Sequence, residues 1–450
     1  MIVQFWNDPA VILLCLMIIL LVDNLWNLYL ILREIKMVYG ARHVPEVLRP
    51  YLSQELFERM RRYKLHKSWF IIVNTLIMVV ICGCLELYFG FYGLLWDLVA
   101  RCAIWSWMKH EIWMSFVYLI FLSLYILVKS LPGKIYEKCC IRKLVKQPKR
   151  SWSQRIAMEL VDICCSLLLM ATMVAVVVSM VNAFNQYAFV GIYLMAVLLT
   201  VIIILIIPIA IDPFVGQRVQ LENQALKAGL EQLTRRVGFS MRYVQIIHVR
   251  DPNVGSNAFF FGSCCLKRIV IFDTLLLNRG LASDARLPPE ERGKGLPNEH
   301  VLAVVAHELG HWKRGHFYKA IVMFQLHLLI TLVLFVICYT HGPIYQAVGF
   351  DVGVQPVIVG FIVIFGFLLT PYLTISNVLM LTMTRQFEYE ADKFAFQLGY
   401  AAHLRMALLK LYADNLTFPL SDTCYSSWHH THPTMLHRLQ RLERLESNGT

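Results

Sequence analysis

The chain has 450 residues, of which 58% are hydrophobic and only 16% are charged, and its formal net charge is +12 at pH 7. Soluble globular domains are about 45–50% apolar and about 25% charged, so this composition excludes an ordinary soluble protein. The twelve cysteines include no C-x-x-C pair, which argues against a zinc ribbon or a disulfide framework. The excess of apolar residues predicts an α-helical integral membrane protein.

Seven long apolar runs are candidate transmembrane helices. They cover roughly residues 10–32, 69–95, 113–131, 160–184, 189–211, 319–340 and 354–382. Ionisable side chains within them include Asp23, Glu86 and His327. Because such groups usually face a bundle interior or a water-filled cavity, we expect the same of these side chains.

Basic residues are concentrated in two segments between these runs. Residues 33–68 contain nine Lys or Arg and residues 132–159 contain eight, whereas residues 96–112 contain only two. The positive-inside rule places the two basic segments in the cytosol and the N-terminus in the lumen. Seven spans then put residues 212–318 and the tail from 383 on the cytosolic side. Since these charges flank membrane spans, the expected partner is the lipid bilayer with its anionic headgroups, and no nucleic acid is expected.

The segments outside the spans predict a small α+β domain. Residues 217–237 have the pattern of an amphipathic helix, and residues 241–250, 256–261 and 268–273 have the pattern of short strands. A later helix, with Asn298 as its N-cap, is expected to continue past His316 into the sixth span. We therefore divide the chain into residues 1–211 with five spans, 212–318, 319–382 with two spans, and 383–450.

Residues 307–311 read His-Glu-Leu-Gly-His, an H-E-x-x-H motif. Two histidines four apart on a helix lie on one face, so His307 and His311 can reach one zinc ion. Glu308 would then lie beside the attacking water as a general base. The motif predicts a zinc peptidase acting on membrane-anchored substrates. The alternative is a helix with two unrelated histidines.

A hydrolytic zinc site needs three protein ligands and one open position. Glu388 and Asp392 follow the last predicted span and are four residues apart, so on a helix they share a face. Glu388 is a candidate ligand, and Asp392 is a candidate hydrogen-bond partner for a ligand histidine. The spacing fits the charged start of an ordinary helix equally well. Glu390, between them, is expected to face solvent.

Two further segments are candidates for the same site. The oxyanion of peptide hydrolysis needs a hydrogen-bond donor, and His432 or Arg438 in the tail could supply it. The apolar strand at 256–262, which includes Asn257, Ala258 and Phe259, could pair with an extended substrate backbone. From the pattern alone, a plain core strand is the better interpretation of that segment.

Five motifs together resemble the type I CAAX prenyl endopeptidases, a family of integral-membrane zinc proteases. They are HELGHWKRGH at 307–316, SNAFFFG at 256–262, RIVIFDTLL at 268–276, TRQFEYEAD at 384–392 and HPTMLHRLQ at 432–440. The resemblance covers essentially the whole chain, including the layout of seven spans. One departure is Glu390, which stands where the family usually has Gln.

The resemblance implies a ring of seven helices around an intramembrane chamber, with a zincin-type zinc peptidase domain on the cytosolic side. It implies removal of the C-terminal tripeptide from farnesylated CaaX proteins, with a second upstream cut in some members. It implies the endoplasmic-reticulum membrane as the location, with the inner nuclear membrane as a second one. The implied partners are therefore prenylated CaaX proteins or peptides and the bilayer.

The resemblance also assigns roles to residues. One Zn²⁺ per chain would be held by three ligands, with further residues acting on water, substrate and ligands around it. The implied ligands are His307, His311 and Glu388; the implied catalytic residues are Glu308, Asp392 and His432; the implied substrate-binding residues are Asn257, Ala258 and Phe259; and Arg438 is implied beside the ligands.

Two other functions remain open on sequence grounds. The first is a membrane quality-control zinc protease that cuts substrates without a prenyl group. The second is a catalytically silent paralogue or a transporter-like scaffold, against which the intact set of Glu308 and three ligand candidates argues. Comparing prenylated with unprenylated peptide separates the two proteases, and zinc content together with a Glu308→Ala variant separates enzyme from scaffold.

Overall fold

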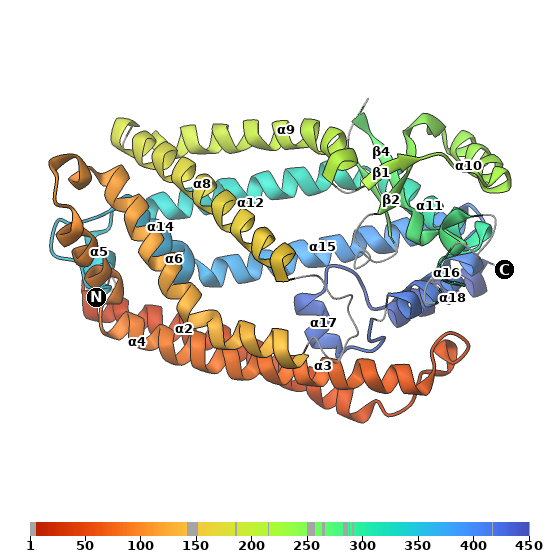
Figure 1. Ribbon diagram of the computed structural model, residues 1–450, viewed down its shortest axis with the longest axis horizontal. Helices are drawn as coiled ribbons and strands as arrows, with labels where there is room; N and C mark the ends of the chain where they lie inside the picture. Colours follow the sequence, from red (N-terminus) through yellow and green to blue (C-terminus); the bar gives the residue numbers. More distant parts are fainter. Residues whose placement is uncertain are drawn as a thin grey trace. The chain divides into compact units, whose positions relative to one another are not determined.

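The computed structural model describes residues 6–141, 152–184, 187–214, 216–249, 257–262, 266–281, 287, 289, 292–415 and 417–449 (Figure 1). The α-helices are α2 (Pro9–Gly40), α3 (Gln54–Asn74), α4 (Cys82–Tyr88), α5 (Phe91–Cys102), α6 (Glu111–Tyr136), α8 (Trp152–Phe184), α9 (Ala188–Phe214), α10 (Gln224–Val237), α11 (Asn298–Lys313), α12 (His316–Tyr339), α13 (Gly342–Ala347), α14 (Val357–Val363), α15 (Thr370–Gln397), α16 (Ala401–Asp414), α17 (Thr423–His429) and α18 (Met435–Gly449). The strands are β1 (Gly216–Val219), β2 (Val244–Val249), β3 (Ala258–Phe261) and β4 (Arg268–Phe272).

The chain forms two compact units, each assembled from separate stretches of sequence. The first consists of Met1–Leu32, His66–Val197 and Gln325–Asn377. The second consists of Arg33–Leu65, Leu198–Phe324 and Val378–Thr450. Several long helices, such as α2, contribute residues to both units.

Within the described residues, six helices are long and apolar enough to cross a membrane. They are Pro9–Gly40, Gln54–Tyr88, Glu111–Tyr136, Leu160–Phe184, Ala188–Ile206 and His316–Tyr339. A seventh candidate is a pair of helices, Val357–Leu368 and Thr370–Gln397, bent by 63° at their junction. Counting this pair as one span gives the seven spans that the sequence predicts. The predicted helical membrane architecture is therefore confirmed.

Polar side chains inside the first unit find partners on neighbouring helices. Glu86 accepts hydrogen bonds from Lys129 at 2.5 Å and from Tyr125 at 2.7 Å. Asp23 on α2 accepts one from the Thr374 hydroxyl at 2.8 Å. Because an unpaired charge is costly in a bilayer, these contacts join the helices that carry them.

The second unit contains one mixed sheet with the strand order β1-β2-β4-β3. β2 and β4 run parallel, and β1 and β3 pair antiparallel on the two outer sides. Alternate side chains of a strand point to opposite faces. One face, with Ile246, Ala258, Ile269 and Ile271, joins the main core formed with α10, α11, α16 and α18. The other face packs Ile247, Val249, Val270 and Phe272 together.

Two element boundaries differ from the prediction. The helix predicted over 217–237 begins only at Gln224, because residues 216–219 form β1 and pair with β2. Asn223 is the residue that caps α10, and its side chain accepts a hydrogen bond from the Leu226 N–H at 3.0 Å.

The helix that carries the H-E-x-x-H motif also ends earlier than predicted. α11 begins at Asn298 and ends at Lys313. Its N-cap is Pro297, whereas the sequence predicted Asn298 for that position. Gly315 adopts a φ of +67°, a left-handed conformation that favours glycine and breaks the helix. α12 therefore starts afresh at His316, and the expectation of one continuous helix was wrong.

A buried ion pair holds the C-terminal tail to α2 and α3 within the second unit. Glu34 is 1% exposed and pairs with Lys64. It also accepts a hydrogen bond from the Ser421 hydroxyl at 2.9 Å. Next to it, Arg33 donates two hydrogen bonds to Asp422, each of 3.1 Å. The segment that leads into α17 and α18 is thereby anchored, which fixes where the tail residues near the motif can lie.

Candidate metal centre

The first part of the candidate site lies on α11, in the core of the second unit. Its neighbours Val301, Val305 and Leu309 are fully buried, which fixes the rotation of the helix about its axis. His307 and His311 lie one turn apart, and their Nε2 atoms are 3.2 Å from one another. The helix therefore aims both imidazoles at one point.

α15 supplies the third group. One carboxylate oxygen of Glu388 lies 3.5 Å from His307 Nε2, and the other lies 3.3 Å from His311 Nε2. These three side chains form a group whose ligand atoms all lie within 4.8 Å of one another. The two segments that the sequence separates by almost eighty residues thus meet in one place.

The close approach of α11 and α15 depends on the glycine of the motif. A Cβ atom built on Gly310 would lie 2.9 Å from Ala391 Cα and 3.1 Å from Phe394 Cβ. Real Cβ atoms do not come that close to backbone. Gly310 therefore lets the two helix backbones touch, at the level where His307, His311 and Glu388 converge.

Asp392 lies one turn beyond Glu388 and supports His307 from behind. Its Oδ1 is 2.9 Å from His307 Nδ1. Arg438 on α18 donates to both oxygens of Asp392, at 2.9 Å from Nε and 2.6 Å from Nη2. Asp392 and Arg438 are both buried, and the negative charge of one compensates the positive charge of the other.

The electrostatics of the site favour a positive charge at its centre. His307 must donate from Nδ1 to Asp392, and its Nε2 faces the carboxylate of Glu388. Burial lowers the pKa of His307, but the hydrogen bonds of Asp392 and Glu388 outweigh burial and raise this pKa to about 10. The raised pKa means that a proton on His307 is favoured beside these two carboxylates. A divalent cation held by two imidazoles and a carboxylate would replace that proton, so the residues fit a metal ion.

Glu308 lies between the metal-ligand candidates and the sheet. Its Oε2 accepts a hydrogen bond of 2.9 Å from the backbone N–H of Phe260 on β3. β3 is an outer strand of the sheet, and no other strand in the described part of the chain pairs with its second side. The structure thus places the predicted general base against the free edge of the sheet.

The predicted substrate residues lie along the same strand. The carbonyl of Asn257 accepts from the Phe272 N–H, so residues 257, 259 and 261 turn their backbone groups toward β4. Ala258 and Phe260 turn theirs to the free edge. The side chain of Phe259 packs against Phe272 on the far face of the sheet, while the side chain of Asn257 is exposed.

The two tail candidates lie in different surroundings. His432 Nδ1 is 3.1 Å from Glu388 Oε2, and its side chain is 62% exposed. Arg438 is 10% exposed and pairs with Asp392 at 2.6 Å and with Glu388 at 3.5 Å. Both therefore lie at the site, but only His432 is open to a molecule entering from outside.

Two residues, His316 and Glu390, lie at the site although they were not predicted to be part of it. The ring of His316, at the start of α12, lies 3.0 Å from His311 between their Nδ1 atoms. Its Nε2 is 3.0 Å from Glu390, whose side chain is 45% exposed, so Glu390 faces solvent as predicted and in addition contacts His316. The signal for His316 was the Gly315-His316 pair at the end of the motif, where the glycine turns the chain back.

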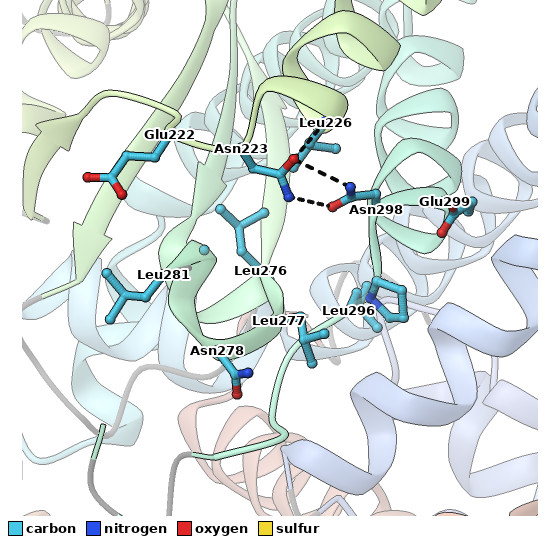
Figure 2. Close-up of a pocket in the computed structure, with 12 residues that line it drawn as sticks. Glu222, Asn223, Leu226, Leu276, Leu277, Asn278, Leu281, Leu296, Asn298 and Glu299 are labelled. Atoms are coloured by element: carbon cyan, nitrogen blue, oxygen red, sulfur yellow. Dashed lines mark hydrogen bonds between the residues drawn. The ribbon is translucent and has the colours of Figure 1, made fainter. Parts of the chain in front are cut away.

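The second unit also has a cavity of about 540 Å³ elsewhere, shown in Figure 2. It is lined by apolar side chains such as Leu276 and by polar ones such as Glu222 and Glu299. At its side, Asn223 donates a 3.0 Å hydrogen bond to Asn298. None of the metal-ligand candidates is among the described residues that line it. The chemistry of the donor groups, rather than cavity volume, therefore identifies the candidate site.

Comparisons with known proteins agree with this geometry. Residues 34–217 match the family described as CAAX prenyl protease N-terminal, five membrane helices, and residues 220–446 match Peptidase family M48. The chain is 31% identical over 449 residues to the CAAX prenyl protease 1 homolog of Homo sapiens, covering 94% of each protein. It is 33% identical over 252 residues to CAAX prenyl protease 1 of Saccharomyces cerevisiae, covering 53% of this chain and 52% of the yeast protein. The crystal structure of S. mikatae Ste24p matches with a TM-score of 0.80 and 26% identity, over 96% of this chain and 99% of that one.

The fold and the site define a multi-pass membrane metallopeptidase. The chain belongs to peptidase family M48, whose two matched regions together include most of its length. The resemblance inferred from the sequence motifs is thereby confirmed.

A Gly310→Ala variant tests the helix contact that brings the ligands together. Alanine is the better helix former by about 1 kcal/mol, yet its methyl group would push α11 away from Ala391. Overpacking of this kind costs about 1–3 kcal/mol. We expect the affinity for added Zn²⁺ to fall by about tenfold, measured by competition with a chromogenic chelator.

Gly229→Ala on α10 is the matched control, because there a Cβ would meet only the flexible side chain of Leu302. We expect its Zn²⁺ affinity to equal that of the wild type. Wild-type affinity in the Gly310→Ala variant would contradict the assigned role of the helix contact.

Proposed function

We propose that this metallopeptidase is a zinc endopeptidase that removes the C-terminal tripeptide from farnesylated CaaX proteins and makes a second, upstream cut in some of them. The observation that carries the proposal is the convergence of His307, His311 and Glu388 beside Glu308, in a membrane protein of family M48. The names of its relatives, CAAX prenyl protease 1, support the substrate class.

We propose zinc as the metal, one ion per chain, held by His307, His311 and Glu388. Two imidazoles and one carboxylate are a common ligand set of catalytic zinc, and they leave a coordination position for water or substrate. When bound, the ion polarises the scissile carbonyl and lowers the pKa of water.

Glu308 is the proposed general base. Its carboxylate takes a proton from the attacking water and passes it to the leaving amine of the cleaved peptide bond. The hydrogen bond from the Phe260 N–H supports this role, because it holds the carboxylate between the ligand histidines and the sheet edge. Asp392 acts through His307, whose ring it orients from the Nδ1 side.

The free edge of β3 is the proposed docking site for the substrate backbone. The backbone groups of Ala258 and the carbonyl of Phe260 face outward there, while the Phe260 N–H is bound to Glu308. An extended peptide can add to the sheet along this edge as a further strand. Asn257 contributes its exposed side chain at the start of the strand. Phe259 supports the strand by packing on Phe272. A peptide placed along this edge would pass Glu308.

His432 and Arg438 have separable roles in this proposal. His432 is exposed and lies against Glu388, so it can donate a hydrogen bond to the oxyanion that develops on the substrate. Arg438 is buried and bound to Asp392, so it positions the carboxylate that positions His307.

Cleavage of a farnesylated CaaX peptide by the purified protein tests the proposed function. We expect release of the tripeptide, loss of activity on chelation, and a decrease of roughly 10²–10⁴-fold in kcat for Glu308→Ala. Glu299→Ala, on the first turn of the same helix, is the matched control and should keep wild-type activity. Mass spectrometry of the products measures the outcome.

The same peptide without its prenyl group discriminates the alternatives. Equal cleavage of both peptides would contradict the substrate class and favour a quality-control protease. Absence of cleavage despite one bound zinc per chain would contradict the enzyme assignment for this substrate and favour a silent paralogue.

We propose that residues 212–318 and 383–450 form the peptidase domain on the cytosolic side, with spans in 1–211 and 319–382 and the N-terminus in the lumen. The distribution of Lys and Arg supports this orientation. We further propose the endoplasmic-reticulum membrane, and the inner nuclear membrane continuous with it, as the location.

Glycosylation tests this orientation. Asn415-Leu416-Thr417 and Asn448-Gly449-Thr450 are acceptor sequons that a cytosolic tail leaves unmodified. The matched control is Ile104→Asn, which completes a sequon with Trp105 and Ser106 in the segment assigned to the lumen. We expect an endoglycosidase-sensitive mass shift for this variant alone. A shift in the wild type that disappears when Asn415 and Asn448 are replaced would overturn the orientation.

A further inference from the structure

His316 is buried at the junction of α11 and α12 and has a polar contact on each side of its ring. Its side chain is 4% exposed. Its Nδ1 is 3.0 Å from Nδ1 of His311, and its Nε2 is 3.0 Å from a carboxylate oxygen of Glu390. The ring stacks on Phe387, with 4.4 Å between ring centroids and 12° between planes. His311, His316 and Glu390, which come from three helices, therefore form one chain of close polar contacts, and Phe387 stacks on the middle ring.

The direction of the hydrogen bonds in this line follows from the metal site. His311 presents Nε2 to His307 and Glu388, so a metal ion would take the lone pair of that nitrogen. A neutral His311 then carries its proton on Nδ1 and donates it to His316 Nδ1. His316 must in turn carry its proton on Nε2 and donate it to Glu390. The protonated nitrogen of His311 therefore determines which nitrogen of His316 carries a proton.

We propose that His316 and Glu390 are positioning residues that orient the metal ligand His311 through this hydrogen-bond relay. The proposal rests on the proposed ligand role of His311. Histidine ligands of metals generally donate their second N–H to a carboxylate, carbonyl or water, which fixes the ring and raises its basicity. His307 has such a partner in Asp392, and the relay gives His311 its equivalent.

The two ligand histidines differ in how their support reaches solvent. Asp392 is 2% exposed and is held by Arg438. Glu390 is 45% exposed and lies 3.7 Å from Lys319, a surface side chain. The hydrogen-bond partners of His307 are therefore buried, whereas the chain of hydrogen bonds from His311 ends at the half-exposed Glu390. The relay therefore connects His311 to groups at the surface.

The local backbone explains why His316 can reach His311. Gly315 has a φ of +67°, and the chain turns there from α11 into α12. This turn brings the residue after the glycine back beside the last turn of α11. Phe387 holds the ring in plane from the α15 side.

Zinc affinity of the metal-depleted and reloaded full-length protein tests the relay. His316→Phe keeps an aromatic ring against Phe387 but removes both hydrogen bonds. We expect its zinc Kd to rise about ten- to a hundredfold, as for other groups that support metal ligands. His316→Gln retains an acceptor and a donor and should recover most of the loss. Glu390→Ala, at a half-exposed position, should raise the zinc Kd several-fold without affecting folding.

His300→Phe is the matched control, because His300 lies on the first turn of the same α11, beside His403 rather than the metal site. It should leave the zinc Kd unchanged. A wild-type zinc Kd in His316→Phe, or in Glu390→Ala if the former does not fold, would overturn the relay. Loss of affinity in His316→Phe without recovery in His316→Gln would also overturn it, since packing rather than hydrogen bonding would then be responsible.

A His311→Ala variant separates the relay from the function on which it rests. If His311→Ala binds zinc as tightly as the wild type, the ligand assignment itself fails. If His311→Ala loses zinc while His316→Phe retains it, only the relay fails.

Discussion

The contact of Gly310 with Ala391 is the constraint on which the metal centre depends. A Cβ atom on Gly310 would clash with Ala391 and hold α11 and α15 apart, and Glu388 could then no longer reach both His307 and His311. The H-E-x-x-H motif supplies only two of three ligands, so the third depends on this helix packing. The glycine inside the motif is therefore as much a part of the site as the histidines, although it has no functional group.

Charge compensation determines how the remaining groups are arranged. Three acidic side chains, Glu388, Asp392 and Glu308, lie at or beside a buried centre. Arg438 lies against both Asp392 and Glu388, and a cation held by the ligands, or a proton on His307, supplies further positive charge beside Glu388. The anchoring of the tail through Glu34 and Lys64 belongs to the same architecture, because the anchored residues Ser421 and Asp422 precede α17, which is followed by α18 with Arg438. Ligand geometry and tail placement are thus coupled within the second unit.

Sequence reasoning succeeded where periodicity or spacing carries the information. The apolar runs gave the spans, and the i, i+4 spacing of Glu388 and Asp392 put them on one helix face, which the structure confirms by placing both beside His307. The prediction failed where the backbone conformation of one residue determines where a helix ends. Gly315 ends α11 and turns His316 toward His311, and nothing in the helical pattern reveals this φ. β1 was also missed, because its four residues form a strand only through pairing with β2.

The central claim is that His307, His311 and Glu388 together hold one zinc ion. The most direct measurement is the zinc content per chain of the purified protein, by elemental mass spectrometry, for the wild type and for Ala substitutions of each ligand. We expect one zinc per wild-type chain and far less than one in each of the three variants. Full zinc occupancy in Glu388→Ala, or no zinc in a folded wild-type protein, would contradict it.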